Sequence, residues 1–417
     1  MPPFRDADGA APIGERVYLY YHFFYPDEVV SARHFGDLAE GLAQRGWQVT
    51  VFTSNRYCRR RGAIEKRRER WRGVEIVRLW RPGLDQSRHL SRLINAVWIM
   101  AAWLWATWRA GAPRAFLVGT DPQFSQLLFP GLKGLFPRSH LLHWCFDLYP
   151  EALLADAPDG ALARLAKVVQ GVMGWFYRRV DHLVDLGPCM RRRLARYGHG
   201  AAVETITPWA LVEPEELPRP DAEVRRALFG EARLVLLYSG NLGRAHEFNL
   251  FLDLAALLEE GVVMAFGCSG SRVEELRAAM ASRKLANVRL LPFAAEAELE
   301  GRLAAADIHL LSLRPDWDGV VVPSKFFGSL AVGRPVVYHG SRESAVGIWV
   351  EQHALGFVLN PDNVVETANR LNALAHCPEE LYGMSRRAFS TYRQAFSKAA
   401  MLERWHTIVA DGARPSG

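Results

Sequence analysis

The chain has 417 residues, of which 49% are hydrophobic and 23% are charged, so it can bury the cores of two or three globular domains. Its net charge of +6 is concentrated in one segment, whereas a nucleic-acid binder usually spreads basic residues along a face, so we expect no nucleic-acid partner. The five cysteines show no CxxC pair and no metal-ligand spacing, which fits a reducing cytoplasm. They are Cys58, Cys145, Cys189, Cys268 and Cys377.

The first half of the chain is predicted to be a Rossmann-like domain. Residues 1–15 are rich in Pro, Ala and Gly without the apolar core of a signal peptide, so we expect a flexible tail. A strand, a helix capped by Ser31 and closed by Gly46, and a second strand follow. Their alternation with later helices and strands predicts a doubly wound parallel sheet. Those later strands are predicted at 74–79, 115–119, 140–146 and 182–187.

Two segments of this half suggest contact with a membrane. Residues 58–73 carry eight Arg or Lys against Glu65 and Glu69, which indicates either a solvated basic loop or a patch for anionic lipid. Residues 93–108 form an uncharged run with four tryptophans, shorter than the roughly 20 residues that span a bilayer. The run is either a buried helix or a helix lying in the membrane surface. We expect a cytoplasmic protein that is peripheral on the inner face of the cell membrane.

The second half repeats the pattern after a passage rich in Pro and Glu. The predicted organisation is an N-terminal domain at 16–207, a linker at 208–221, a C-terminal domain at 222–385 and a helix at 386–417 that returns to the first domain. The fold class is therefore α/β, with two Rossmann-like domains facing across a cleft. Strands of the second domain are predicted at 233–240, 262–267, 288–293, 307–313, 334–340 and 356–360.

Ligands of such sheets lie beyond the carboxyl ends of the strands, and two loops there suit an anion. In LYSGNLGRAHEFN, residues 237–249, Gly240 and Gly243 let the backbone approach a ligand, and Arg244 offers a planar donor fork for phosphate. In VVPSKFFGSLAVGRP, residues 321–335, a short helix capped by Ser324 is predicted to end at 332. Lys325 adds a charge to the helix end that already favours anions. Two such cationic sites together predict a diphosphate ligand.

Three weaker sites each have a plain structural alternative. Gly270 lies in a further glycine turn, FGCSGSRVEEL, which can be an ordinary tight turn. His143 and Asp147 follow a strand in HWCFDLYPE, where a histidine is usually a satisfied core residue. Asp316 and Asp318 have the spacing of a metal-binding pair, but the neighbouring Pro and Gly explain a turn equally well. We therefore predict no metal, and no cofactor is implied.

In their order and spacing these motifs resemble the family 4 glycosyltransferases with the GT-B architecture, in particular bacterial enzymes of surface-polysaccharide assembly. The resemblance runs from Arg16 to Trp405. It implies a nucleotide diphosphate sugar as donor and a polyprenyl-linked or glycan acceptor. It also implies a metal-independent transfer with retention of the anomeric configuration. The residues carried over are Arg244, Lys325, His143 and Asp147 as catalytic, Gly240, Asn241, Gly243, Arg244, Gly270, Pro323, Ser324 and Lys325 as donor-binding, and Tyr25, Asp27 and Glu151 on the acceptor side.

One departure from the family pattern keeps other functions open. The family often has two glutamates separated by seven residues, and Val320 and Gly328 stand in those places here. A catalytically silent GT-B protein that scaffolds an assembly complex is one alternative. A GT-B nucleotide-sugar 2-epimerase is another, since it ionises the same anomeric bond. A Rossmann oxidoreductase is disfavoured because the dinucleotide fingerprint is missing.

Overall fold

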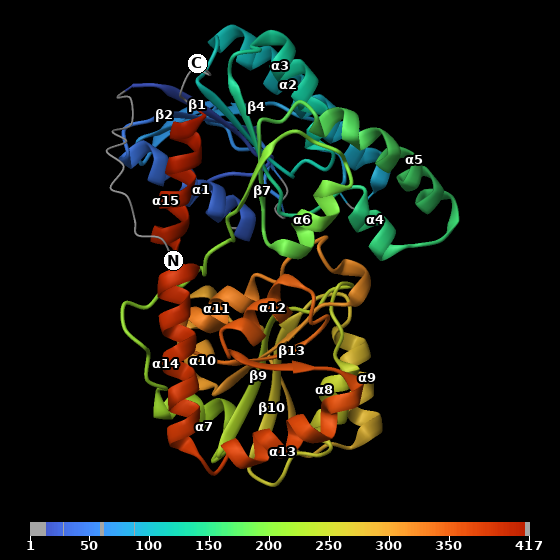
Figure 1. The fold of residues 1–417 in the computed structure, drawn as a ribbon, viewed down its shortest axis with the longest axis vertical. Coiled ribbons are helices and arrows are strands. Elements are labelled where there is room, and N and C mark those ends of the chain that lie inside the picture. The colour runs from blue at the N-terminus through green and yellow to red at the C-terminus, as the bar shows by residue number, and fades with distance from the viewer. Residues whose placement is uncertain (1–13, 28, 59–61, 87, 413–417) are drawn as a thin grey trace. The chain divides into compact units, whose positions relative to one another are not determined.

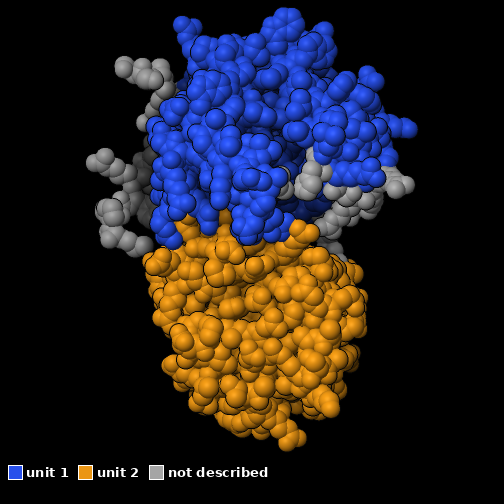
Figure 2. Space-filling view, turned by 90° about the vertical axis from the view of Figure 1, so that its right-hand side faces the viewer, with its two compact units in different colours: residues 1–186, 191–206, 401–417 blue, residues 187–190, 207–400 orange. Residues whose placement is uncertain are grey.

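The computed structural model describes residues 14–27, 29–58, 62–86 and 88–412 (Figure 1). Most of the predicted tail at 1–15, and Arg59, Arg60 and Arg61 of the basic segment, lie outside the described residues. The chain forms two compact units (Figure 2). Unit 1 comprises residues 1–186, 191–206 and 401–417, and unit 2 comprises residues 187–190 and 207–400.

Unit 1 contains an eight-stranded sheet. Its strands in spatial order are β3 (Arg68–Trp71), β4 (Val74–Leu79), β2 (Gln48–Ser54), β1 (Arg16–Tyr20), β5 (Ala115–Gly119), β6 (His140–Trp144), β7 (His182–Asp185) and β8 (Ala202–Thr205). All neighbours pair in parallel except β3, which runs antiparallel to β4. The two edge strands, β3 and β8, have four residues each and none of them is fully buried, so the apolar runs that predicted the inner strands are missing from them.

Helices cover both faces of this sheet. They are α1 (Val30–Gln44), α2 (His89–Ala110), the 3-10 turn η1 (Ser125–Leu127), α3 (Leu128–Leu135), α4 (Glu151–Asp156), α5 (Gly160–Tyr177), α6 (Pro188–Ala195) and α15 (Lys398–Asp411). Successive residues of a strand point to opposite faces. Trp144 of β6 accordingly contacts Phe35 of α1 and Trp405 of α15, whereas the preceding His143 contacts α3 and α5.

The start of α1 corrects one prediction. The helix begins at Val30, its N-cap position is Val29, and no side chain caps it. Ser31 instead lies inside the first turn, where its hydroxyl hydrogen-bonds the phenol of Tyr21. The predicted capping role of Ser31 is therefore wrong, because a tertiary partner takes the hydroxyl that would otherwise accept from the backbone.

The C-terminal helix completes the core of unit 1. Trp405 of α15 is fully buried, with its ring centroid 4.9 Å from that of Trp144. The indole Nε1 of Trp47 donates to His406 at 3.3 Å, and Arg45 forms an ion pair with Glu403 at 3.1 Å. This packing follows from the burial of large aromatic side chains, which supply much of the free energy of a core.

Unit 2 contains a six-stranded parallel sheet flanked by helices. Its strands in spatial order are β11 (Val288–Leu291), β10 (Val262–Ser269), β9 (Leu234–Asn241), β12 (Ile308–Ser312), β13 (Val336–His339) and β14 (Gly356–Leu359). Its helices are α7 (Ala222–Phe229), α8 (Asn249–Ala255), α9 (Val273–Arg283), α10 (Leu299–Ala305), α11 (Lys325–Ala331), α12 (Ala345–Gln352), α13 (Val364–Leu374) and α14 (Pro378–Ala395), with 3-10 turns η2 (Glu296–Glu298), η3 (Pro315–Trp317) and η4 (Pro361–Asn363). The predicted fold class, two doubly wound α/β domains, is confirmed.

Candidate functional site

Three loops of unit 2 pack together beyond the carboxyl ends of β9, β10 and β12. The amide of Leu242 donates to the carbonyl of Ser269 at 2.6 Å, and the amide of Arg272 donates back to the carbonyl of Leu242 at 3.2 Å. The amide of Arg314 donates to the carbonyl of Ala245 at 2.8 Å. Because backbone bonds fix all three loops, their side chains are held at one edge of the sheet, where ligands of such folds bind.

Two glycines make this packing possible. Gly240 has φ +125° and Gly270 has φ +128°, both in the region that residues with a side chain rarely adopt. A Cβ on Gly240 would lie 2.7 Å from Cε of Lys325, and one on Gly270 would lie 2.5 Å from the side-chain oxygen of Asn241. These two predicted donor-site glycines are therefore required for loop packing, whatever they also do for a ligand.

Lys325 lies against the carboxyl end of β9. Its ammonium donates to the phenol of Tyr238 at 2.5 Å and to the carbonyl of Asn241 at 2.6 Å, and it sits 4.0 Å from the centroid of the Tyr238 ring. Burial lowers the pKa of Lys325 to about 7. These partners, a phenol with its ring and a backbone carbonyl, carry no negative charge, so an arriving anion would favour the charged amine.

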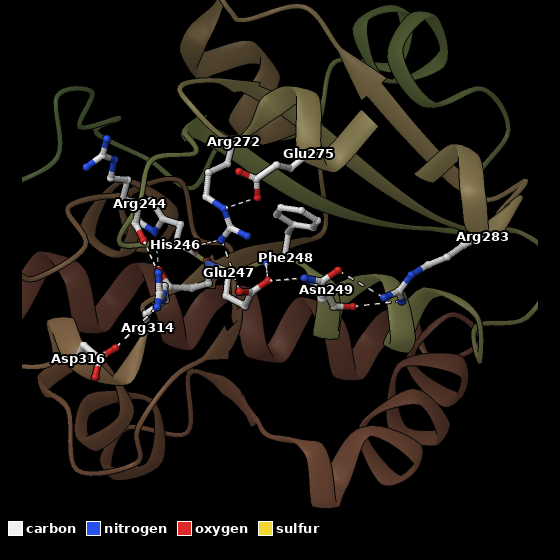
Figure 3. Close-up of polar contacts among 11 residues, drawn as sticks. Arg244, His246, Glu247, Phe248, Asn249, Arg272, Glu275, Arg283, Arg314 and Asp316 are labelled. Atoms are coloured by element: carbon white, nitrogen blue, oxygen red, sulfur yellow. Dashed lines mark hydrogen bonds and ion pairs between the residues drawn. The ribbon is translucent and has the colours of Figure 1, made fainter. Parts of the chain in front are cut away.

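Arg244 lies three residues after Asn241, on the same loop, and is exposed. Its carbonyl accepts a hydrogen bond from Nη1 of Arg314 at 3.5 Å. Its guanidinium extends away from the neighbouring pair of Glu247 and Arg272 (Figure 3). The structure thus brings the two predicted cations to the loop after β9. Lys325 donates to the backbone at the start of this loop, and the side chain of Arg244 is exposed on it.

Two further arginines at this edge were not predicted. Nη1 of Arg272 donates to the carbonyl of His246 at 2.5 Å and lies 3.4 Å from Glu247, while its Nε pairs with Glu275 at 2.9 Å (Figure 3). Through these contacts Arg272 holds the loop after β9 in place. Arg314 pairs more loosely with Asp316, at 3.7 Å. Arg272 follows β10 and Arg314 follows β12, so both could have been found by the signal that identified Arg244, a position shortly after a buried strand.

His246 and Glu247 hold the loop from within. Nδ1 of His246 donates to the carbonyl of Ser312 at 2.6 Å, and burial followed by the charge of Lys325 lowers the pKa of His246 to about 3. The imidazole is therefore neutral near pH 7. The carboxylate of Glu247 accepts from the amides of Phe248 and Asn249 at 2.8 and 3.0 Å, which caps α8. Burial opposes ionisation of Glu247, but these hydrogen bonds outweigh it and lower its pKa.

The helix that carries Lys325 differs from its prediction. It spans Lys325–Ala331, and Ser324 occupies the N-cap position without a side-chain hydrogen bond. The amides of Phe326 and Phe327 donate to the carbonyls of Pro323 and Ser324. The predicted cap by Ser324 is wrong, and the helix end has fewer free amides than expected because tight turns use them. Lys325 itself is therefore the stronger anion-binding feature.

The places of the two family glutamates differ from each other. Val320 is fully buried, so a carboxylate would be costly there. Gly328 has no heavy atom within 4 Å of the position a Cβ would occupy.

Asp316 and Asp318, the pair with the spacing of a metal site, have different partners. Asp316 pairs with Arg314, and Asp318 accepts a hydrogen bond from the thiol of Cys189. Across the described part of the chain, no group of three or more His, Cys, Asp or Glu is arranged to hold a metal ion.

Two predicted residues of unit 1 belong to its interior. His143 is fully buried, its Nδ1 donates to the carbonyl of Val118 at 2.8 Å, and burial lowers its pKa to about 4. Glu151 is also buried, where it accepts from the phenol of Tyr197 and, at 3.0 Å, from Gln170. A side chain enclosed in this way cannot touch substrate, so the catalytic role predicted for His143 and the acceptor-side role of Glu151 are wrong.

Tyr25 and Asp27 shape the loop after β1. The ring of Tyr25 stacks on Trp71 with centroids 5.0 Å apart, and its carbonyl accepts from Arg78 at 2.5 Å. Asp27 accepts from the amide of Cys58 at 2.5 Å. Tyr25 remains exposed and open to a ligand, whereas the hydrogen bonds of Asp27 are used to join two loops.

Asp147 lies instead among polar groups at the carboxyl ends of β1, β5 and β6. Its amide donates to the hydroxyl of Thr120 at 3.4 Å. Burial, and then the charge of nearby Asp121, raise the pKa of Asp147 to about 6. His22, which follows β1, contacts Asp121 through Nδ1 at 3.2 Å. His22 and Asp121 were not predicted, although each lies two residues after a buried strand, close to the kind of position that identified Asp147.

Comparisons with known proteins show which families and folds this chain is similar to. Residues 31–209 match the family model of the glycosyl transferase 4-like domain. A probable glycosyltransferase, WbjE from Pseudomonas aeruginosa, is 25% identical over 339 residues, which cover 79% of this chain and 82% of that protein. Sucrose-phosphate synthase from Thermosynechococcus elongatus superposes with a TM-score of 0.71 at 14% identity, over 95% of this chain and 98% of the other. Anabaena Alr3699/HepE, solved with UDP and glucose, gives 0.66 at 14% identity, over 95% and 100%. These solved structures have the GT-B fold.

Proposed function

We propose that this protein is a family 4 glycosyltransferase, which moves a sugar from a nucleotide diphosphate to a polyprenyl-linked or glycan acceptor in surface-polysaccharide assembly. The match of residues 31–209 to the glycosyl transferase 4-like domain and the GT-B fold over nearly the whole chain support this proposal. The observation that carries the proposal is the half-buried ammonium of Lys325, held against the start of the loop that also bears Arg244. The solved complex of Alr3699/HepE with UDP and glucose supports a donor of this class.

The cations of unit 2 suit the charge that develops in this reaction. As the bond between the anomeric carbon and the β-phosphate oxygen breaks, negative charge builds on the diphosphate while the sugar becomes cationic. Lys325, Arg244 and Arg314 supply positive charge at one edge of the sheet, and the backbone bonds of the loops hold them there before the reaction. Preorganised charge of this kind stabilises a leaving group without rearrangement. Metal independence is part of the proposal.

Asp147 is our candidate on the acceptor side. In the transfer, the acceptor oxygen forms the new bond to the anomeric carbon and gives up its proton. A carboxyl with a pKa of about 6 can take that proton near neutral pH. Asp121 keeps that pKa up through its own charge, and His22 is fixed against Asp121. Retention of the anomeric configuration, which the resemblance implies, belongs to the proposal and is read from the NMR spectrum of the product.

A thermal-shift screen of nucleotide sugars tests this function. A ligand that binds only the folded chain raises its Tm, and we expect that at least one uridine, guanosine or thymidine diphosphate sugar does so. Incubation of that donor with a lipid-linked acceptor should then give a glycosylated lipid. If no donor raises the Tm, the proposal is lost.

A catalytically silent scaffold is the second candidate, favoured by the absence of carboxylates at Val320 and Gly328. Product analysis separates the possibilities. A donor that binds but is never consumed indicates the scaffold, and a changed sugar that is still attached to its nucleotide indicates an epimerase. Transfer that disappears in Lys325→Ala but is present in the parent rejects both.

A further inference from the structure

Unit 1 exposes an unusual amount of apolar surface on α2. The inner face of this helix, which includes Ile99 and Trp103, is buried against the sheet. Its outer face is also apolar, with exposed fractions between 43% and 69%. The residues of this outer face are Leu90, Leu93, Ile94, Val97, Trp98, Trp105 and Trp108. A helix that is apolar all round normally has a partner on every side.

Helix α5 repeats this arrangement. Its inner face, with Met173 and Tyr177, is buried. Its outer face carries Leu165, Val168, Val172 and Trp175, exposed between 46% and 68%. Their spacing of three, four and three residues places them on one stripe. The two helices therefore share a pattern in which the side turned away from the core is also apolar.

The register of the sheet places both helices on the same face. Tyr20 of β1, Val118 of β5 and His143 of β6 are aligned across neighbouring parallel strands, so their side chains point the same way. Trp103 and Thr107 of α2 contact Tyr20. Tyr177 of α5 contacts His143. Helix α3 packs against both α2 and α5 and adds exposed Leu135, while η1 just before it adds exposed Leu127. Figure 1 shows these helices together on one side of unit 1.

The stretches of chain that form α2 and α5 carry charges of one sign. No Asp or Glu occurs between Asp85 and Asp121 or between Asp159 and Asp181. The basic residues in these two stretches are Arg88, Arg92, Arg109, Arg114, Arg164, Lys167, Arg178 and Arg179. Two of the arginines lie over exposed indoles: Arg109 is 5.0 Å from the Trp105 ring, and Arg179 is 3.5 Å from the Trp175 ring. Exposed tryptophan beside arginine is the composition that favours the headgroup level of a membrane.

The basic segment at 58–73, in contrast, is largely neutralised where the structure describes it. Arg68 pairs with Glu75, Arg72 pairs with Glu40, and Lys66 lies 3.9 Å from Glu69. None of the described helices combines the length and the apolar content that crossing a bilayer requires. Attachment from one side, by the outer faces of α2, α3 and α5, needs no crossing helix.

We infer that the outer faces of α2, α3 and α5 form one docking surface for an anionic lipid bilayer. In this surface α2 acts together with α5, and not with the basic segment at 58–73. The inference rests on the proposed function only in that a lipid-linked acceptor gives such a protein a reason to reside at a membrane. The apolar stripes enter the headgroup boundary, the tryptophans lie at its level, and the basic residues meet lipid phosphates.

Flotation of the full chain with vesicles tests this surface. We expect the protein to float with vesicles of phosphatidylcholine and phosphatidylglycerol at low salt, and much less with phosphatidylcholine alone. The double variants Val168→Ser/Val172→Ser on α5 and Trp105→Ser/Trp108→Ser on α2 should each weaken binding about tenfold or more, since apolar burial drives insertion. Val365→Ser, an equally exposed apolar residue of unit 2, should change nothing.

Three outcomes would overturn the inference. The chain fails to float with anionic vesicles, the α5 variant floats as well as the parent, or light scattering shows a dimer that the same variants dissociate, which would make a second copy the occupant. Nucleotide-dependent thermal shifts, measured on each variant, show that it is folded. They also separate this test from the proposed function, because the donor can bind in solution even if no vesicle is bound.

Discussion

The two units place opposite charges at the same edge of similar sheets. In unit 2, the loops after β9, β10 and β12 carry arginines, and the ammonium of Lys325 donates to the phenol of Tyr238 and the carbonyl of Asn241 at the end of β9, neither of which is charged. In unit 1, the residues after β5 and β6 include Asp121 and Asp147, close enough that one charge raises the pKa of the other. One architecture can thus present cations at the edge of one sheet and carboxylates at the same edge of the other, because strand-end loops vary while the sheets stay the same.

The largest effect should come from the acidic edge. Asp147→Asn removes the proposed proton acceptor, so we expect turnover to fall by about 10²- to 10⁴-fold. Donor affinity should stay within a factor of about two, since we propose that the other unit binds the donor. Initial rates and equilibrium dialysis measure the two quantities, and Asp159→Asn, an exposed carboxylate of the same unit, is the control.

The same edge gives a pH test. The parent rate should fall as the pH drops through about 6, where Asp147 becomes protonated. Asp121→Asn removes a charge that raises this pKa, so the acid limb of the rate profile should move to lower pH. An unchanged limb would show that Asp147 does not control the rate.

The cationic edge should give the next effect. Lys325→Ala removes the half-buried ammonium, and we expect the affinity for a nucleotide diphosphate to fall about 10²- to 10³-fold. Lys284→Asn is the matched control in unit 2, because Lys284 is exposed and asparagine tolerates its left-handed backbone, φ +52°. Equal losses in both variants would refute a specific role for Lys325.

A third pair of variants tests the two places where the family has glutamates. Val320→Glu puts a carboxylate into a fully buried position, so the free energy of unfolding should drop by more than about 3 kcal/mol. Gly328→Glu enters open space on a helix and should change stability by only about 1 kcal/mol, in the stabilising direction. Urea denaturation compares them. A tolerated Val320→Glu would show that this part of unit 2 is less tightly packed than described.

The smallest effect concerns proton uptake by Lys325. Its pKa is about 7 without ligand, and a bound diphosphate should raise it. The protonated form then binds more tightly, so affinity is greatest below pH 7 and declines above it, by at most about tenfold per pH unit. Calorimetry in two buffers with different ionisation enthalpies counts the protons taken up. No proton uptake at pH 8 would contradict this assignment.

The sequence predicted the inner strands and the position of the cationic loop well, since buried parallel strands are continuous apolar runs and the glycines mark their exits. It could not predict which side of a strand a residue faces. His143 and Trp144 are adjacent, yet they lie on opposite faces of the sheet. It also could not show that the ammonium of Lys325 would contact Tyr238 and the backbone of Asn241, because those contacts depend on how three loops pack. Both the face of the sheet that a side chain occupies and the contacts of Lys325 depend on residues that are distant in the sequence.

The most direct test of the central claim is calorimetric titration of the purified chain with uridine, guanosine and thymidine diphosphates in buffer that contains a metal chelator. We predict saturable binding of at least one nucleotide, and a matching loss of that binding in Lys325→Ala. Binding that needs an added divalent cation, or the absence of binding to all three nucleotides, would contradict the assignment of unit 2 as a metal-independent diphosphate site.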